Sequence, residues 1–205
     1  MIIRLATRTS PLALWQARHI AGLLLSVDPS IEVEEVGVES TGDRVQDRPL
    51  GQIGGDGLFT KEIQAAVLDG RAHAAVHSLK DLPTAPVPGL RLTSVPQRGP
   101  TGDAFVSRKH GSFANLPKNA RIGTSSIRRK AQLLWYRPDL EIVDLRGNVD
   151  TRLKKLVDQG LDGIILAEAG LERLGYQSKI TEILDRNWML PAVGQGAVGV
   201  ETLGE

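Results

Sequence analysis

The alternation of apolar and polar positions divides the chain into short buried strands and amphipathic helices. Runs of small and β-branched residues predict strands, whereas apolar residues repeated every three or four positions predict helices. The predicted strands are Ile2–Ala6, Ile31–Val38, Ala74–Val76, Leu90–Val95, Ala104–Ser107, Arg121–Gly123, Glu141–Leu145 and Gly163–Ala167. Strands that alternate with helices predict an α/β fold with parallel sheets and right-handed crossovers.

Good capping residues precede three of the predicted helices. Ser10 stands before Pro11, and Ser125 or Ser126 and then Asn148 precede two later apolar repeats. Such side chains accept hydrogen bonds from the first amides of a helix, and proline suits the first helical position. The positions predicted to face the core are Leu12, Trp15, Ile20, Leu23 and Leu24, then Phe59, Ile63, Ala66 and Val67, then Ile127, Ala131, Leu134 and Trp135, and finally Val149, Leu153, Leu156 and Val157.

Two stretches rich in proline and glycine, near residues 96–102 and 190–197, interrupt the periodic pattern. Such composition predicts hinges, so we expect two doubly wound α/β domains flanking a ligand cleft. A polar stretch, Glu39–Gly57, contains QIGGDG and is long for a loop inside one domain. We expect that stretch to be mobile.

The sequence AVHSLKDLP, residues 75–83, places Lys80 and Asp81 directly after a predicted buried strand. Pro83 disfavours helical geometry at the residue before it, so the pair lies on a turn. In open α/β sheets ligands bind beyond the carboxyl ends of strands, which makes Asp81 a candidate catalytic carboxylate. A structural role, in which Asp81 caps its own turn, is an equally open interpretation.

Arginines recur at the expected amino-terminal ends of helices. They are Arg8 before the Ser10 cap, Arg128 and Arg129 after the Ser126 cap, and Arg146 and Arg152 around the Asn148 cap. A helix amino terminus carries partial positive charge and disfavours a cation, so repeated arginines there indicate that an anion binds. For any single arginine a solvated surface role remains the simpler interpretation.

The amino-acid composition argues against several classes of function. The formal net charge is +1, so no overall field attracts nucleic acid or a membrane surface. The absence of cysteine from these residues excludes a disulfide framework and a thiol nucleophile within them. The four histidines have no metal-ligand spacing, and we predict no metal site. We see no signal peptide or membrane-spanning run and expect a cytoplasmic protein.

Seven motifs in register resemble one known family. The motifs are ATRTSPLALWQA, GGDGLFTKEI, AVHSLKDLP, GTSSIRR, LRGNVDTRL, ILAEAGLERLG and LPAVGQGAVGVE, which run from the first strand to about Glu201. Together they resemble the porphobilinogen deaminases, also called hydroxymethylbilane synthases.

This resemblance implies a transferase of tetrapyrrole biosynthesis, which condenses four porphobilinogen molecules into hydroxymethylbilane and releases ammonia. It also implies a fold like that of type II periplasmic binding proteins, with a small third domain added. The first domain would then comprise residues 1–96 plus 197–205, and the second would comprise residues 97–196. The family builds its product on a dipyrromethane cofactor attached to a cysteine, and we expect a monomer with no nucleic-acid or membrane partner.

The resemblance also assigns roles to residues. Asp81 matches the catalytic carboxylate, which would assist ammonia loss, stabilise the cationic intermediates and help the final deprotonation. The residues that match carboxylate-binding arginines and further polar contacts to the pyrrole chain are Arg8, Ser10, Lys80, Thr124, Ser126, Arg128, Arg129, Arg146, Asn148, Arg152 and Arg173.

The chain departs from the family pattern in two respects. Many members carry lysines where this chain has Gln52 and Asp56. The sequence ends at Glu205, where the third domain with the cofactor cysteine would begin. We therefore expect the 205 residues alone to be inactive.

Two other functions stay open at this point. A two-lobed binding module for an anionic ligand would explain the cleft and hinges without catalysis. An RNA-binding protein could use the basic segment RIGTSSIRRK, although the near-neutral charge and few aromatic residues disfavour it.

Overall fold

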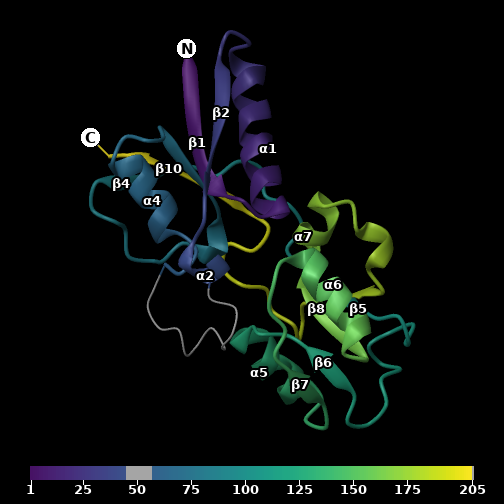
Figure 1. The fold of residues 1–205 in the computed structure, drawn as a ribbon. Coiled ribbons are helices and arrows are strands. Elements are labelled where there is room, and N and C mark those ends of the chain that lie inside the picture. The colour runs from purple at the N-terminus through teal and green to yellow at the C-terminus, as the bar shows by residue number, and fades with distance from the viewer. Residues whose placement is uncertain (45–56, 205) are drawn as a thin grey trace. The chain divides into compact units, whose positions relative to one another are not determined.

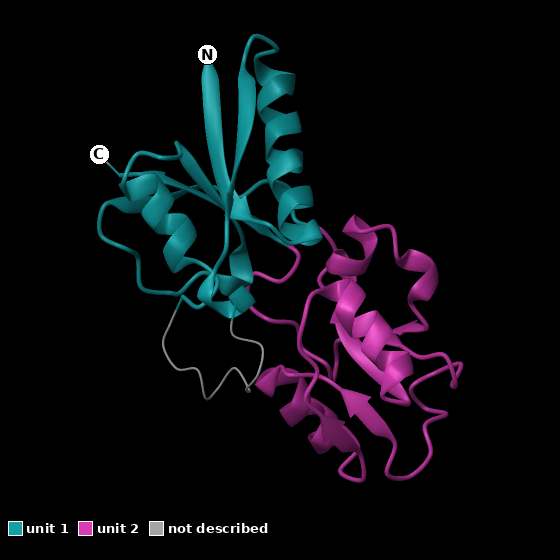
Figure 2. Ribbon diagram, viewed as in Figure 1, with its two compact units in different colours: residues 1–98, 197–205 teal, residues 99–196 magenta. Residues whose placement is uncertain are grey.

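The computed structural model describes residues 1–44 and 57–204, and residues 45–56 and 205 lie outside this description. The chain forms two compact units (Figure 2): unit 1 is Met1–Arg98 with Ala197–Glu205, and unit 2 is Gly99–Gly196. Most of the stretch predicted to be mobile, with Gln52 and Asp56, falls outside the described residues. Its first part contains a short helix, α2 (Thr41–Arg44), that the sequence pattern did not predict.

Unit 1 is a five-stranded mixed sheet with the strand order β2-β1-β3-β10-β4. Its strands are β1 (Ile2–Arg8), β2 (Glu32–Val38), β3 (Ala74–Ser78), β4 (Leu90–Ser94) and β10 (Val198–Leu203). Strand β1 runs parallel to β2 and β3, whereas β10 is antiparallel to both β3 and β4. The last described strand thus completes a sheet that the first strand begins (Figure 1).

Helices cover both faces of the unit 1 sheet because neighbouring strand residues point to opposite sides. Leu5 and Val76 pack with Ile20 of α1 (Pro11–Val27). Ala6 and Ala75 face the other way and pack with Ile63 and Val67 of α4 (Lys61–Leu68). This sandwich makes unit 1 a doubly wound α/β unit.

Unit 2 repeats the design with the strand order β7-β6-β8-β5-β9. Its elements are β5 (Asp103–Val106), β6 (Arg121–Gly123), α5 (Ile127–Tyr136), β7 (Glu141–Val143), α6 (Val149–Asp158), β8 (Gly163–Ala167), α7 (Glu168–Arg173), the 3₁₀ turn η2 (Gln177–Lys179) and β9 (Glu182–Ile183). Phe105 and Ile165 pack with Leu133 of α5, whereas Ile164 packs with Leu156 of α6 and Leu171 of α7 on the opposite face.

The expectation of parallel sheets was wrong for two strands. In unit 1 β10 is antiparallel to its neighbours, and in unit 2 β5 is antiparallel to β8 and β9. Both strands adjoin the two points where the chain passes between the units. The hydrophobic pattern of a strand reports burial on its two faces but not its direction, so the sequence could not distinguish these cases.

Some predicted helix faces were also wrong in part. In α5 the side chains of Ile127 and Trp135 are 77% and 75% exposed, and Arg129 and Leu133 are buried instead. In α1 Leu23 is exposed, and Ala13, Gln16 and Ala17 are buried with Ile20. The two polar side chains on these buried faces have specific partners, since Gln16 hydrogen-bonds Ser78 and Arg129 pairs with Asp103. No helix within residues 1–44 and 57–204 is long and apolar enough to cross a membrane.

Candidate functional site

Asp81 closes a short 3₁₀ turn, η1 (Leu79–Asp81), that directly follows β3. The turn cannot continue because Leu82 has extended geometry before Pro83, and the Leu82 amide donates to Leu79 O at 3.2 Å. Among the described residues, the Asp81 carboxylate accepts no hydrogen bond and joins no ion pair. It is half-buried, and Lys80 beside it is exposed. A carboxylate held on a rigid turn without a protein partner is available to a ligand.

Arg8 lies at the carboxyl end of β1, the parallel neighbour of β3. Its guanidinium forms a two-point ion pair with Asp43 of α2, in which Nε donates to Asp43 Oδ2 at 3.0 Å. It also lies 4.5 Å above the ring of Phe59. Burial alone would raise the pKa of Asp43, but hydrogen bonds from Arg8 and Ser40 outweigh burial and lower it. Arg8 and η1 therefore share the carboxyl edge of the unit 1 sheet, where α/β proteins bind ligands.

Ser10 has the capping role that the sequence predicted. Its hydroxyl accepts from the Ala13 amide at 3.4 Å and begins α1, with Pro11 at the first helical position. Gln16 of this helix donates to Ser78 Oγ at 2.9 Å, which ties the helix to the end of β3 next to η1.

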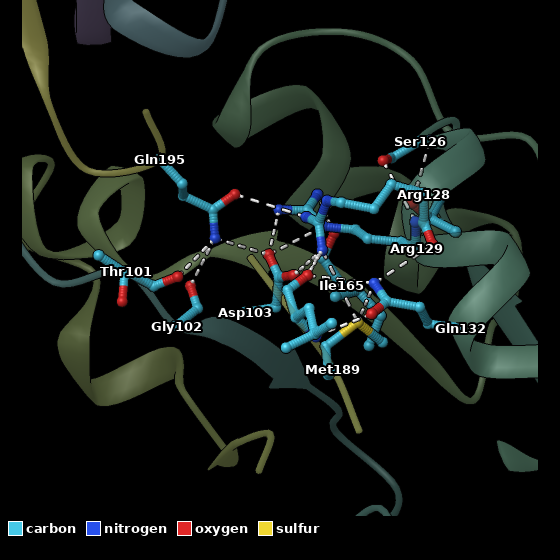
Figure 3. Close-up of polar contacts among 12 residues, drawn as sticks. Thr101, Gly102, Asp103, Ser126, Arg128, Arg129, Gln132, Ile165, Met189 and Gln195 are labelled. Carbon is cyan, nitrogen blue, oxygen red and sulfur yellow. Dashed lines mark hydrogen bonds and ion pairs between the residues drawn. The ribbon is translucent and has the colours of Figure 1, made fainter. Parts of the chain in front are cut away.

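In unit 2 the side chains of Arg128 and Arg129 converge on one buried carboxylate, Asp103 (Figure 3). Arg129 donates to Asp103 Oδ1 from Nε at 3.0 Å and from Nη2 at 2.7 Å, and its Nη1 donates to Ile165 O at 3.0 Å. Arg128 Nη1 lies 2.7 Å from Asp103 Oδ2. The Asp103 and Arg129 side chains are 0% and 6% exposed, whereas Arg128 is 25% exposed.

The ionisation of this cluster follows from burial and charge. Burial would raise the pKa of Asp103, but the charges and hydrogen bonds of Arg129 and Arg128 outweigh burial and lower it. Burial lowers the pKa of Arg129, and Asp103 partly offsets that effect. Two arginines on one carboxylate leave one net positive charge, and Arg128 is the exposed member that can present it to a ligand.

The remaining unit 2 candidates follow the carboxyl ends of β6, β7 and β8. Ser126 accepts from the Arg129 amide at 3.4 Å and Asn148 accepts from the Thr151 amide at 2.9 Å, so both predicted caps are confirmed. Thr124 is buried, and its hydroxyl accepts from the Ser126 amide at 3.2 Å. The loops after β6 and β7 are joined because Leu145 N donates to Ser125 Oγ at 3.0 Å.

Two of the last three arginines donate to backbone carbonyls of the same unit. Arg152 Nε donates to Gly147 O at 2.7 Å, and Arg173 Nη2 donates to Gly196 O at 2.6 Å. Burial lowers the pKa of Arg173, partly countered by Glu172. The Arg146 side chain is buried beside the amino terminus of α6. These residues and the Arg128 cluster share the carboxyl edge of the parallel strands of unit 2.

Sequence reasoning missed the partners of the candidate arginines, namely Asp43, Asp103 and Gln195. Asp103 begins the apolar run DAFV, and a charge at the start of a fully buried strand could have indicated a salt bridge. Gln195 was treated only as part of a glycine-rich crossover, yet it is 1% exposed. Asp43 lies in a polar stretch with no local signal.

Solved structures with the same fold define the class of protein. The periplasmic VFT2 domain of Bordetella pertussis BvgS matches with a TM-score of 0.56 at 14% identity, covering 98% of this chain and 80% of that one. The methionine-binding protein MetQ matches with a TM-score of 0.60 at 12% identity, covering 98% and 83%. The chain therefore has the two-lobed fold of type II periplasmic binding proteins, as the family resemblance implied.

Sequence comparisons define the family within this class. The family model for "Porphobilinogen deaminase, dipyromethane cofactor binding domain" matches residues 3–205. The porphobilinogen deaminase of Syntrophomonas wolfei is 53% identical over 199 residues, covering 97% of this chain and 65% of that protein. The enzyme of Xanthomonas campestris is 52% identical over 203 residues, covering 99% and 67%. This chain belongs to the porphobilinogen deaminase family, and it spans about two thirds of the length of these relatives.

The donor set of unit 2 fits part of the cofactor that this family model names. Dipyrromethane carries carboxylates, and a guanidinium such as that of Arg128 can bind a carboxylate through two parallel hydrogen bonds. The family's thioether attachment requires a cysteine sulfur, and these 205 residues contain none. The residues present therefore fit the polar part of the group and not its covalent attachment.

Proposed function

We propose that these residues form the porphobilinogen-binding and catalytic part of a tetrapyrrole-building transferase. The product would be hydroxymethylbilane, made from four porphobilinogen molecules with release of four molecules of ammonia. The observation that carries the proposal is the carboxylate of Asp81, which lies at the carboxyl edge of β3 and has no hydrogen-bond or ion-pair partner within residues 1–44 and 57–204. Family membership supports the same assignment.

Asp81 would stabilise positive charge during the condensation. Loss of ammonia from the aminomethyl group of porphobilinogen leaves a cationic methylene-pyrrolenine, and a nearby carboxylate lowers the energy of that cation. The free α-carbon of the growing chain attacks the methylene carbon and forms a new carbon–carbon bond. The attack leaves the positive charge on the attacking pyrrole of the chain, and Asp81 then assists removal of the proton from its α-carbon, which restores the aromaticity of that ring.

The arginines would hold the carboxylates of the growing chain. Each pyrrole carries an acetate and a propionate, so the number of negative charges rises with every condensation. Charge-assisted hydrogen bonds contribute about 1.5–3 kcal/mol each, which makes several arginines a suitable site for a polyanion. The residues we assign to this site are Arg8, Ser10, Lys80, Thr124, Ser126, Arg128, Arg129, Arg146, Asn148, Arg152 and Arg173. Arg129 contributes indirectly, since its donors are used on Asp103 and Ile165 O.

Bound dipyrromethane would supply the primer on which the chain grows. Arg128, Arg152 and Arg173 are the residues of unit 2 that we expect to bind its carboxylates. Lys80 would add a further positive charge beside Asp81 in unit 1.

Asp81→Asn tests the proposal in a form of the protein that carries the family's cofactor cysteine. We expect turnover of porphobilinogen to fall by roughly a hundredfold or more, since general acid–base and electrostatic groups contribute effects of this size. Ammonia release and uroporphyrin formed after oxidation measure turnover. Asp158→Asn is the matched control, because Asp158 is a half-exposed partner of Lys154 on α6.

Near-normal turnover by Asp81→Asn would remove Asp81 from the catalytic role. Binding of porphobilinogen without any turnover in the unaltered protein would instead favour the two-lobed binding module for anionic ligands.

A further inference from the structure

Gln195 is a buried residue of unit 2 whose side chain connects Arg128 to the start of β5 (Figure 3). Its Nε2 donates to Thr101 O at 2.7 Å, to Gly102 O at 3.1 Å and to Asp103 Oδ1 at 3.1 Å. Because all three partners are acceptors, they determine the orientation of the amide. The Oε1 atom therefore faces Arg128, whose Nη2 lies 3.5 Å away.

The backbone around Gln195 is also fixed by specific contacts. Gly99 N donates to Gly196 O at 3.0 Å, so the two segments that enter and leave unit 2 lie side by side. Gly196 has a φ of +83°, and a Cβ there would lie 2.6 Å from Gly99 O. Only glycine tolerates both this conformation and this close approach. The amide of Gln195 is thus presented from a rigid crossover.

These contacts occupy one side of the Arg128 guanidinium. Nη1 contacts Asp103 Oδ2 at 2.7 Å and donates to Leu190 O, and Nη2 faces Gln195. Among the described residues, no protein atom accepts a hydrogen bond from Arg128 Nε. Nε and Nη2 form the side of a guanidinium that binds carboxylates with two parallel hydrogen bonds. The neutral amide of Gln195 orients this side without cancelling its charge.

We infer that Asp103 and Gln195 are positioning residues that hold Arg128 with its Nε side directed to a ligand carboxylate. This inference rests on the proposed function, because the carboxylate would be an acetate or propionate of the pyrrole chain. Arg129 does not bind the ligand carboxylate in this inference, because its donors are used on Asp103 and Ile165 O. It holds Asp103 in the position from which Asp103 contacts Arg128.

Gln195→Met removes both amide functions at nearly constant volume, and Gln132→Met is its matched control. Gln132 also contacts the Arg128 region, but it donates to the backbone carbonyls of Arg128 and Leu190 and does not contact the guanidinium. Guanidinium nitrogen NMR of the 205-residue chain reports whether rotation about the Cζ–Nε bond is slow. Arg128→Lys identifies the Arg128 signals.

We expect separate Nη signals for Arg128 in the unaltered chain and in Gln132→Met, and measurably faster exchange between them in Gln195→Met, where Asp103 and Leu190 O still hold Nη1. Arg129 should keep separate signals in all three, which serves as an internal check of folding. In a titration with porphobilinogen we expect the Arg128 Nε signal to shift, with an affinity about fivefold lower in Gln195→Met, the equivalent of one hydrogen bond.

If the NMR spectrum of the unaltered chain shows fast rotation about the Cζ–Nε bond of Arg128, the inference is overturned and no variant is needed. Unchanged rotation and affinity in Gln195→Met would also overturn it. If Gln195 controls the rotation of Arg128 but porphobilinogen shifts no signal, the positioning stands and the proposed substrate fails.

Discussion

Charged side chains that are buried within either unit have specific partners. In unit 2 Asp103 is surrounded by two guanidinium groups, and in unit 1 Glu201 lies 3.1 Å from His77 Nε2 and accepts from Gln64 at 2.8 Å. Removal of one partner from such a pair leaves a desolvated charge, which costs more than the hydrogen bond itself. These residues therefore tolerate conservative replacement poorly, even far from any ligand.

The packing around Gly163 predicts the effect of adding one methyl group to the core. It lies in β8 against the buried ring of Phe105, and an added Cβ would overlap that ring, with Cζ at 2.9 Å. We expect Gly163→Ala to reduce the free energy of unfolding by about 1–3 kcal/mol, the usual cost of overpacking a core. Urea unfolding followed by tryptophan fluorescence measures the change.

Gly22→Ala is the control, because an added Cβ in α1 would meet no atom within 4 Å. An alanine inside a helix should stabilise by roughly 0.5–1 kcal/mol relative to glycine. Equal effects of the two replacements would contradict the packing explanation.

At the scale of elements, caps and strands were predicted better than helix faces and strand directions. Ser10, Ser126 and Asn148 cap their helices because a capping hydrogen bond spans only three residues. The exposed Trp135 and the buried Arg129 of α5 reverse the expected pattern, since the partner of Arg129 lies on a distant strand. The predicted core position of Val157 on α6 was wrong too, because that residue is 50% exposed while Leu156 is buried.

The pairing of β3 with β10 predicts a pH effect on unit 1. Burial would raise the pKa of Glu201, but hydrogen bonds from His77 and Gln64 outweigh burial and lower the pKa below its ordinary value of 4.5. A carboxyl group whose pKa is lower in the folded state than in the unfolded state stabilises the fold at pH values above its unfolded-state pKa. This contribution is lost as the pH falls through its folded-state pKa. The stabilisation should thus be present near neutral pH and disappear in acid.

Glu201→Gln should lower the free energy of unfolding by about 1–3 kcal/mol near neutral pH, and by less below about pH 4. Hydrogen exchange of peptides from β3 and β10 reports the loss locally. Glu141→Gln is the control, because Glu141 is 60% exposed and pairs with Arg121 only at 3.5 Å. A difference that stays constant with pH would show that the ionisation of Glu201 is not involved.

At the scale of the whole chain, each unit has its own core and its own set of candidate ligand groups. Asp81 and Arg8 belong to unit 1, whereas Arg128, Arg146, Arg152 and Arg173 belong to unit 2. Among the described residues, two hydrophobic clusters lie in each unit. The proposed reaction therefore draws on residues whose local structures are built separately.

The composition predicts how the 205-residue chain behaves with substrate. The family's primer is held through a carbon–sulfur bond, and the only sulfur atoms here belong to Met1 and Met189, which are not thiol nucleophiles. We expect the chain alone to give no sustained uroporphyrin from porphobilinogen, even with free tetrapyrrole primer added. Mass spectrometry of the purified chain should give the unmodified mass of 22.1 kDa.

A porphobilinogen deaminase that carries the cofactor cysteine, assayed in parallel, is the positive control for that experiment. Multiple turnovers by the cysteine-free chain would mean that reversible binding by the arginines is sufficient to retain the primer.

Local physical chemistry explains what could be predicted without coordinates. The β-branched runs specify strands, Ser10, Ser126 and Asn148 specify where helices begin, and Asp81 follows a buried strand on a turn that Pro83 ends. All of these depend on residues within a few positions of each other. The motifs that resemble the family are local in the same sense, and the family comparison bears them out.

Contacts between distant residues required the folded chain. Arg129 meets Asp103 across 26 positions, Arg8 meets Asp43 across 35, and Gln64 meets Glu201 across 137. No periodicity encodes which carboxylate a guanidinium will find, because that depends on strand order and direction. The antiparallel placement of β5 and β10 brings Asp103 to Arg129 of α5 and Glu201 to His77 of β3, and neither strand direction is readable from the local sequence.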